Sequence, residues 1–179
     1  MREGRKKRLL FYVFLLGVTN STPSNAKGFD LPAMVQDVIP EGCTHYAHNP
    51  SGRQAYRMGS LPENKGRIWI IPCTVRLSET TQVVIRAMPS SPVELLTFRQ
   101  WDHGVWNTSP YLFNVTYDDQ SGVLTSLHRD DSLGDCGTWT VWQASGADFI
   151  MQRLDAKTEC DGREGPYRTL YLYPGNRPS

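Results

Sequence analysis

The sequence predicts a mostly β protein of the α+β class: an antiparallel sheet, sandwich or partly open barrel with one short N-terminal helix and two disulfides. Three observations support this prediction. Short runs of β-branched and aromatic residues recur along the chain, with turn residues between them. Helical spacing of apolar residues marks one short stretch near the start. Four cysteines follow a leader of the kind that directs export.

The first 26 residues have the pattern of a cleaved signal peptide. Five basic residues within positions 2–8 precede an apolar run of about ten residues, which is too short to span a bilayer. The small residues Ser24 and Ala26 occupy the third and the last position before a cut after Ala26. Residues 27–179 then form a single disulfide-stapled β-rich domain, and no stable membrane anchor is expected after cleavage.

The charge of the chain excludes a typical nucleic-acid-binding protein. The leader carries five of the 19 Lys and Arg residues and one of the 18 Asp and Glu residues. Residues 27–179 therefore carry 14 basic and 17 acidic side chains, a net charge of about −3 with His neutral. Nucleic-acid binding requires a basic surface, which this composition does not provide.

The four cysteines, Cys43, Cys73, Cys136 and Cys160, predict two disulfides, because an even number behind an export signal is typical of a disulfide framework. Their wide spacing does not fit a zinc site, which needs paired short spacings. Three connectivities are possible. We expect Cys43–Cys73 and Cys136–Cys160, because these partners are nearest in sequence.

Residues 31–38 are predicted to form the helix, because their apolar positions follow the i, i+3, i+4, i+7 spacing. Asp30 is a suitable N-cap, Pro32 suits the first turn, and Pro40 ends the helix. Residues 43–64 are polar and predict a loop with a short strand at 54–58.

Residues 67–75 contain a continuous apolar run, which is typical of a strand buried on both faces. Pro72 within this run predicts a bulge or an edge position. Further strands are expected at 82–88 and 93–98 on either side of a turn, and at 111–117 and 123–128 in a hairpin.

The C-terminal part predicts a three-stranded meander over 138–142, 149–154 and 167–173. In its last strand, residues 167, 169, 171 and 173 should share one face. Gly134 and Gly137 bracket the cysteine before the meander, so the backbone there takes positive φ or packs closely. Asp135 between them is expected to accept backbone N–H groups and fix the turn.

Residues 99–110 are predicted to form a loop with an unusual density of aromatic and polar groups. Its candidate partner-binding residues are Arg99, Trp101, Asp102, His103 and Trp106. Tryptophan and arginine dominate binding hot spots, so this loop is the candidate site for a macromolecular partner. The alternative is that Trp101 and Trp106 fold back over the core.

The motif Leu133-Gly134-Asp135-Cys136-Gly137, followed by Trp139, Phe149 and Cys160-Asp161-Gly162, resembles the family known as domain of unknown function 1176. Ile71-Pro72-Cys73 is also similar to that family's strand ending in Pro-Cys. The resemblance implies a secreted protein of a Gram-negative bacterium and hence a periplasmic location. The sequence departs from the family in its length, because many members are about twice as long. It also has Tyr167 where the family has a Trp.

Other polar clusters have simple structural interpretations. Residues 128–131, His-Arg-Asp-Asp, are interpreted as a turn of solvated charges. His45 and His48 could bind a metal, but no third ligand accompanies them at a clear spacing, so no metal or other cofactor is expected. Trp139 is interpreted as a core residue.

Two functions remain open. The first is a non-enzymatic binding module, such as an inhibitor or immunity protein, whose partner is a periplasmic protein or a cell-wall component. Small size, export, disulfides and the absence of a catalytic sequence motif favour it. The second is a wall-active hydrolase that uses Asp135, His103 or His128.

We predict that the exported protein begins at Lys27, because the leader ends in the small residues that signal peptidase requires. Intact-mass measurement of protein from a periplasmic extract tests this cleavage. Retention of residues 1–26 in a membrane fraction would contradict it.

Overall fold

The computed structural model describes residues 31–44, 54–57 (backbone), 66–76, 79–130, 135–163 and 165–176. One group of strands comprises β1 (Gln54–Arg57), β2 (Arg67–Val75), β3 (Thr80–Ala87), β4 (Glu94–Leu95) and β7 (Tyr111–Phe113). A second comprises β8 (Thr116–Asp118), β9 (Val123–Arg129), β10 (Gly137–Ser145), β11 (Asp148–Lys157) and β12 (Arg168–Leu172). The remaining elements are β5 (Phe98–Asp102), β6 (Val105–Ser109), α1 (Ala33–Gln36), and the 3₁₀ turns η1 (Glu41–Cys43) and η2 (Pro174–Asn176).

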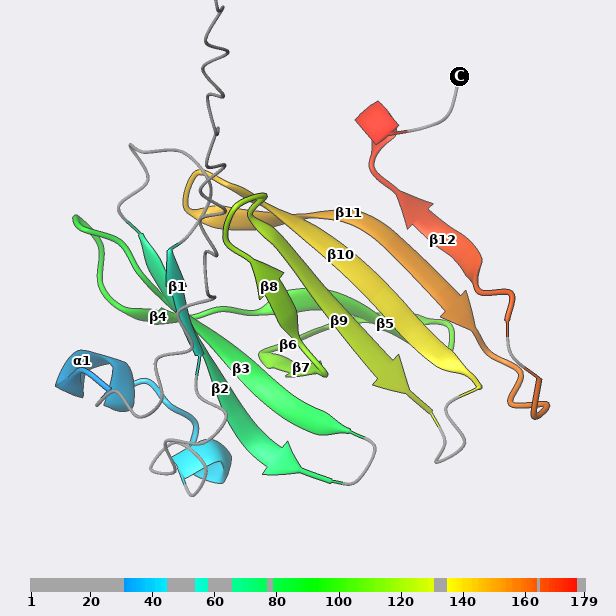
Figure 1. The fold of residues 1–179 in the computed structure, drawn as a ribbon, viewed down its shortest axis with the longest axis horizontal. Coiled ribbons are helices and arrows are strands. Elements are labelled where there is room, and N and C mark those ends of the chain that lie inside the picture. Colours follow the sequence, from blue (N-terminus) through cyan, green and yellow to red (C-terminus); the bar gives the residue numbers. More distant parts are fainter. Residues whose placement is uncertain are drawn as a thin grey trace, which may run out of the picture.

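Two open, five-stranded antiparallel sheets form the body of the protein (Figure 1). The first sheet has the order β1–β2–β3–β4, and β7 also pairs with β3. The second has the order β12–β11–β10–β9–β8, and β5 with β6 forms a separate hairpin. The predicted mostly β fold is confirmed, as an open arrangement of sheets and not a barrel. Within the described ranges, no helix has the length and apolar character needed to cross a membrane.

The first sheet is buried on both faces. Along β2, Ile68 and Ile70 join the core between the two sheets, whereas Trp69 and Ile71 join a second core on the opposite face. Successive strand residues point to opposite faces, so the continuous apolar run follows from this double burial. The register shifts after Pro72, which confirms the predicted bulge and lets an internal strand accommodate a residue without an N–H donor.

The second core lies under α1 and η1 (Figure 1). α1 is shorter than the predicted helix, because it begins after Pro32 and has four residues. Beyond it, the N–H groups of Val38 and Ile39 bond to carbonyls three residues earlier, and Pro40 follows. A residue before proline is disfavoured in the α conformation, which explains the early end. The proposed cap Asp30 lies outside the described residues.

Both predicted disulfides are present. Cys43–Cys73 connects η1 to β2 inside the second core, and Cys136–Cys160 connects the start of β10 to the segment after β11. The predicted meander is also confirmed as β10, β11 and β12. Its last strand differs in one respect. A register shift pairs Tyr171 with Leu154 but Thr169 with Asp155. Tyr171 and Thr169 therefore lie on opposite faces of the sheet.

Two predicted strands are interrupted where the chain changes sheets. Residues 111–117 divide into β7 and β8 at Asn114, which has a φ of 45°. Asn tolerates this left-handed conformation, and its amide side chain bonds to Thr80 in β3 and to Leu127 in β9, each at 3.0 Å. Residues 93–98 likewise divide, because the chain leaves the first sheet after β4 and enters β5.

Arg86 joins the two sheets through ion pairs. Its side chain is 10% exposed and pairs with Glu94 of β4 and, at 2.9 Å, with Asp148 at the start of β11. Its guanidinium also donates to the carbonyl of Ala147. A buried charge needs such partners, so this position links β3 to the β10–β11 turn.

We expect the double substitution Cys136→Ala/Cys160→Ala to lower the melting temperature by about 6–12 °C. The closed loop of 24 residues contributes about 3 kcal/mol in the chain-entropy model, and each kcal/mol corresponds to about 2–4 °C for a domain of this size. Calorimetry of the purified domain measures the shift. Met34→Ala, at an exposed position of α1, serves as the control, and an equal melting temperature in both variants would refute the prediction.

Candidate functional site

The prediction that residues 99–110 form a loop is wrong, because this segment belongs to the β5–β6 hairpin. Trp101 lies opposite Trp106 and Asp102 opposite Val105, so two residues form the connection. These are His103, with a φ of 44°, and Gly104, with a φ of 92°. Two successive positive φ values are the geometry of a tight hairpin turn, whose twist matches that of the flanking strands.

One face of the hairpin gathers aromatic and cationic groups. Directly paired residues share a face, so Trp101, Trp106 and Arg99 lie together, and we call this the outer face. The guanidinium carbon of Arg99 lies 4.3 Å from the centre of the Trp106 ring, within the range of a cation–π contact. Trp106 remains 37% exposed. The outer face therefore presents a flat aromatic group with a fixed positive charge above it.

The tip of the hairpin carries a polar pair. His103 Nδ1 lies 2.6 Å from Asp102 Oδ1, and both side chains are exposed. The hydrogen bond to Asp102 raises the pKa of His103, and the nearby charge of Asp130 raises it further. The predicted partner residues are thus divided: Arg99, Trp101 and Trp106 form the outer face, and Asp102 and His103 form the tip.

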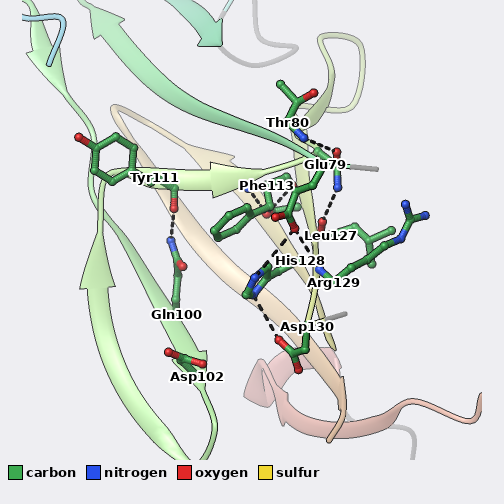
Figure 2. A network of polar contacts seen from close by, with 12 residues as sticks. Glu79, Thr80, Gln100, Asp102, Tyr111, Phe113, Leu127, His128, Arg129 and Asp130 are labelled. Atoms are coloured by element: carbon green, nitrogen blue, oxygen red, sulfur yellow. Dashed lines mark hydrogen bonds and ion pairs between the residues drawn. The ribbon is translucent and has the colours of Figure 1, made fainter. Parts of the chain in front are cut away.

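The opposite face of the hairpin borders a cavity of about 390 Å³. Gln100 and Asp102 project from β5 on the side that faces His128 (Figure 2). The Gln100 side chain donates a hydrogen bond of 2.6 Å to the carbonyl of Tyr111, and Ser109 accepts one of 3.1 Å from the Tyr111 N–H. These bonds hold the hairpin against β7, so the cavity has a defined wall.

The second sheet supplies the opposite wall. On the face of β10 that points toward the hairpin, the residues from the core outward are Trp142, Thr140 and Thr138. All three line the cavity. Their partners on β9 change in the same order, listed from the core outward as Leu124, Ser126 and His128. Large apolar side chains are thus followed by small hydroxyl-bearing side chains and an imidazole. These smaller side chains leave space unfilled, and that space is the cavity.

His128 occupies the outer end of this wall. Its ring stacks on Phe113 with 4.0 Å between ring centres and 18° between planes. Glu79 lies 3.9 Å from its Nε2 and Asp130 lies 3.6 Å from its Nδ1 (Figure 2). The interpretation of residues 128–131 as a solvated turn is therefore wrong for His128 and Arg129, which end strand β9; position 131 lies outside the described residues.

Asp135 accepts a backbone N–H group, which is one part of its predicted role. Its side chain is buried and accepts a hydrogen bond of 2.5 Å from the N–H of Gly162, beside the disulfide. Lys157 lies 3.5 Å from the same carboxylate oxygen. Gly137 has a φ of 139°, and a Cβ there would lie 2.1 Å from the carbonyl oxygen of His128. Gly134 lies outside the described residues.

Trp139 does not line this cavity, and the prediction that it is a core residue is wrong. On β10, Trp142 is the core tryptophan and is 2% exposed, whereas Trp139 is half-buried with the Arg153 guanidinium carbon 5.6 Å from its ring centre. Trp139 and Trp142 are an odd number of positions apart, so they point to opposite faces of β10. The proposed metal ligands His45 and His48 lie outside the described residues.

The sequence interpretation missed the cavity and the residues that border it. Gln100 and Asn107 lay inside the expected loop, and Glu79 lay between expected strands. Thr138 and Thr140 were recognised only as strand formers. The sequence did allow one prediction. Side chains alternate between the two faces of a strand, so Thr138 and Thr140 must lie on the same face as Trp142.

Comparisons with known proteins show the family to which the chain is similar. The family described as protein of unknown function DUF1176 matches residues 42–173. The uncharacterized protein YpfG of Escherichia coli is 29% identical over 127 residues, which cover 67% of this chain and 36% of YpfG. The chain thus spans about a third of the length of this relative. No solved structure matches it significantly. The chain belongs to the DUF1176 family of proteins of unknown function.

Proposed function

We propose that this protein is a periplasmic, non-enzymatic binding module that binds another exported or wall-active protein through the outer face of the β5–β6 hairpin. An inhibitor or immunity-type role fits such a module. The observation that carries the proposal is the exposed pair of Arg99 and Trp106 on a hairpin that joins neither sheet. Arg and Trp are the residues most often found at the energetic centre of protein interfaces.

The burial pattern supports a binding role over a structural one. Phe98, at the start of β5, belongs to the core between the sheets, whereas Trp101 and Trp106 belong to neither core. The hairpin is therefore attached by Phe98 and by polar contacts to β7, and its tryptophans are not required to fill the interior. An aromatic side chain left exposed beside an ordered cation is typical of a recognition surface.

Two further observations support the periplasmic location. The two disulfides together include all four cysteines, and disulfides persist in oxidising compartments. The pattern of residues 1–26 is typical of an export leader. Cleavage after Ala26 would release the domain without its basic leader.

We expect Trp106→Ala to lower the free energy of unfolding by less than about 1 kcal/mol, as for other exposed positions. The same variant should lose a partner that the unchanged protein captures from a periplasmic extract of the producing bacterium. Denaturant unfolding measures the first effect, and affinity capture with mass spectrometry measures the second. Met34→Ala, on the opposite side of the first sheet, is the matched control and should keep the partner.

A structural role for Trp106 would produce a different result. Removing a core tryptophan costs about 3–5 kcal/mol, and any loss of partner would then follow from unfolding. Trp142→Ala provides this comparison, because Trp142 is 2% exposed in the core between the sheets. A stability loss for Trp106→Ala as large as that for Trp142→Ala would contradict the proposal, and so would a partner retained by Trp106→Ala.

The second candidate function is hydrolysis of the cell wall, and the position of His128 favours it. An imidazole that lines a cavity with a carboxylate near each ring nitrogen resembles a general base with its orienting acid. Asp135 and His103 do not support this candidate, because Asp135 is buried beside Lys157 and His103 lies at the hairpin tip.

The binding proposal predicts that the purified protein releases no soluble fragments from isolated cell wall. Chromatography of the supernatant after prolonged incubation measures this release. Fragments formed by the unchanged protein and lost in His128→Gln would establish the hydrolase instead. His103→Gln is the control for loss of an imidazole outside the cavity.

A further inference from the structure

The cavity behind the hairpin has an interior unlike the core that it continues. Across the second sheet, the row Trp142–Leu124 is apolar, the next row is Thr140–Ser126, and the outermost is Thr138–His128. An ordinary sandwich would continue with large apolar side chains at these inner positions. Small polar side chains occupy them instead, and an open space of about 390 Å³ remains. That volume lies in the range of small-ligand sites.

Several polar groups of the cavity are available to a ligand. Thr140 is 5% exposed, and within the described part of the chain its hydroxyl bonds to no other residue. The same is true, among the described residues, of the Thr138 hydroxyl and of the Asn107 amide. Thr138 is half-buried and Asn107 is exposed, and the Thr140 hydroxyl is open to the cavity, so each of these groups can take a partner from outside the protein. A hydroxyl-lined interior of this kind is therefore suited to a molecule that supplies those partners.

The charges around the cavity restrict the class of ligand. No Lys or Arg side chain is among the described residues that line it, so the described lining offers no permanent positive charge to an anion. Asp102 is already paired with His103, and His128 lies between Glu79 and Asp130. These carboxylates repel an anionic ligand. The available hydroxyl and amide groups both donate and accept hydrogen bonds, which matches a ligand whose own groups do both.

We propose that this cavity binds an uncharged sugar. The hydroxyl groups of a pyranose ring both donate and accept hydrogen bonds, and the C–H faces of the ring can pack against aromatic residues such as Tyr111 and Phe113, which border the cavity. The cavity uses the face of the hairpin opposite to Arg99 and Trp106, so the proposal does not depend on protein binding by the outer face.

Titration with a matched set of sugars tests the proposal. The neutral probes are glucose, galactose, mannose and N-acetylglucosamine, each added up to about 10 mM, which detects millimolar dissociation constants. Glucosamine and glucuronate present the same ring with a positive or a negative charge. Protein-observed NMR should show saturable shifts with at least one neutral sugar and none with glucuronate, which the carboxylates beside the cavity repel. Glucosamine should bind no more tightly than the neutral sugars, because those carboxylates are already paired with His103 and His128. Saturation by no neutral sugar, or tighter binding of glucosamine, would overturn the proposal.

Thr140→Val separates cavity binding from other effects. Valine keeps the shape of threonine but removes the hydroxyl, so we expect about tenfold weaker sugar binding, the loss of one hydrogen bond. An unchanged melting temperature shows that the variant folds. Thr74→Val, at an exposed site of β2, is the matched control and should bind normally. Equal affinity in both variants would overturn the assignment of the cavity.

Trp106→Ala distinguishes failure of this proposal from failure of the proposed protein binding. Trp106 is not among the residues that line the cavity. Sugar affinity should therefore be unchanged in Trp106→Ala while protein capture is lost. Thr140→Val should give the reverse result. Loss of both activities in both variants would show a single shared site and would overturn the separation of the two faces.

Discussion

The edge-to-face contact between Phe98 and Trp142 places the hairpin on the rest of the molecule. The two ring centres lie 5.2 Å apart, and Phe98 also meets Phe149 at 6.0 Å. A two-stranded hairpin alone is barely stable in water, so β5 and β6 depend on this anchor in the core. The positions of the outer face, the tip and the hairpin's cavity wall depend on this contact. All three are formed by β5, which begins at Phe98, and by β6, which pairs with β5.

Much of the fold could be predicted from residue patterns of short range. The run at 67–75 was recognisable because consecutive β-branched and aromatic residues leave few alternatives to a buried strand. The disulfides could be paired by proximity in sequence because both join neighbouring elements. Asp135 could be recognised as an acceptor of backbone N–H groups from its position between glycines. Adjacent residues suffice for the strand, whereas the disulfides join cysteines 30 and 24 residues apart and Asp135 accepts its hydrogen bond from Gly162.

The candidate site depends on contacts between distant segments, which local patterns do not contain. Residues 99–110 suggested a loop because aromatic and polar groups obscured the strand pattern, although a two-residue His103-Gly104 turn fits a hairpin. The cavity depends on the register that places Thr140 beside Ser126 and His128 beside Thr138. A shift of one residue in that pairing would move these side chains to the other face, so composition alone cannot locate them.

The alternation along β5 has a consequence for how this protein can diverge. Arg99 and Trp101 occupy one set of positions, and Gln100 and Asp102 occupy the set between them. Mutations at Arg99 therefore alter the outer face and mutations at Gln100 or Asp102 alter the cavity side, whereas Trp101 also borders the cavity and is shared by both surfaces. A single five-residue strand can thus carry two specificities that evolve separately except at Trp101, provided that Phe98 continues to hold it in place.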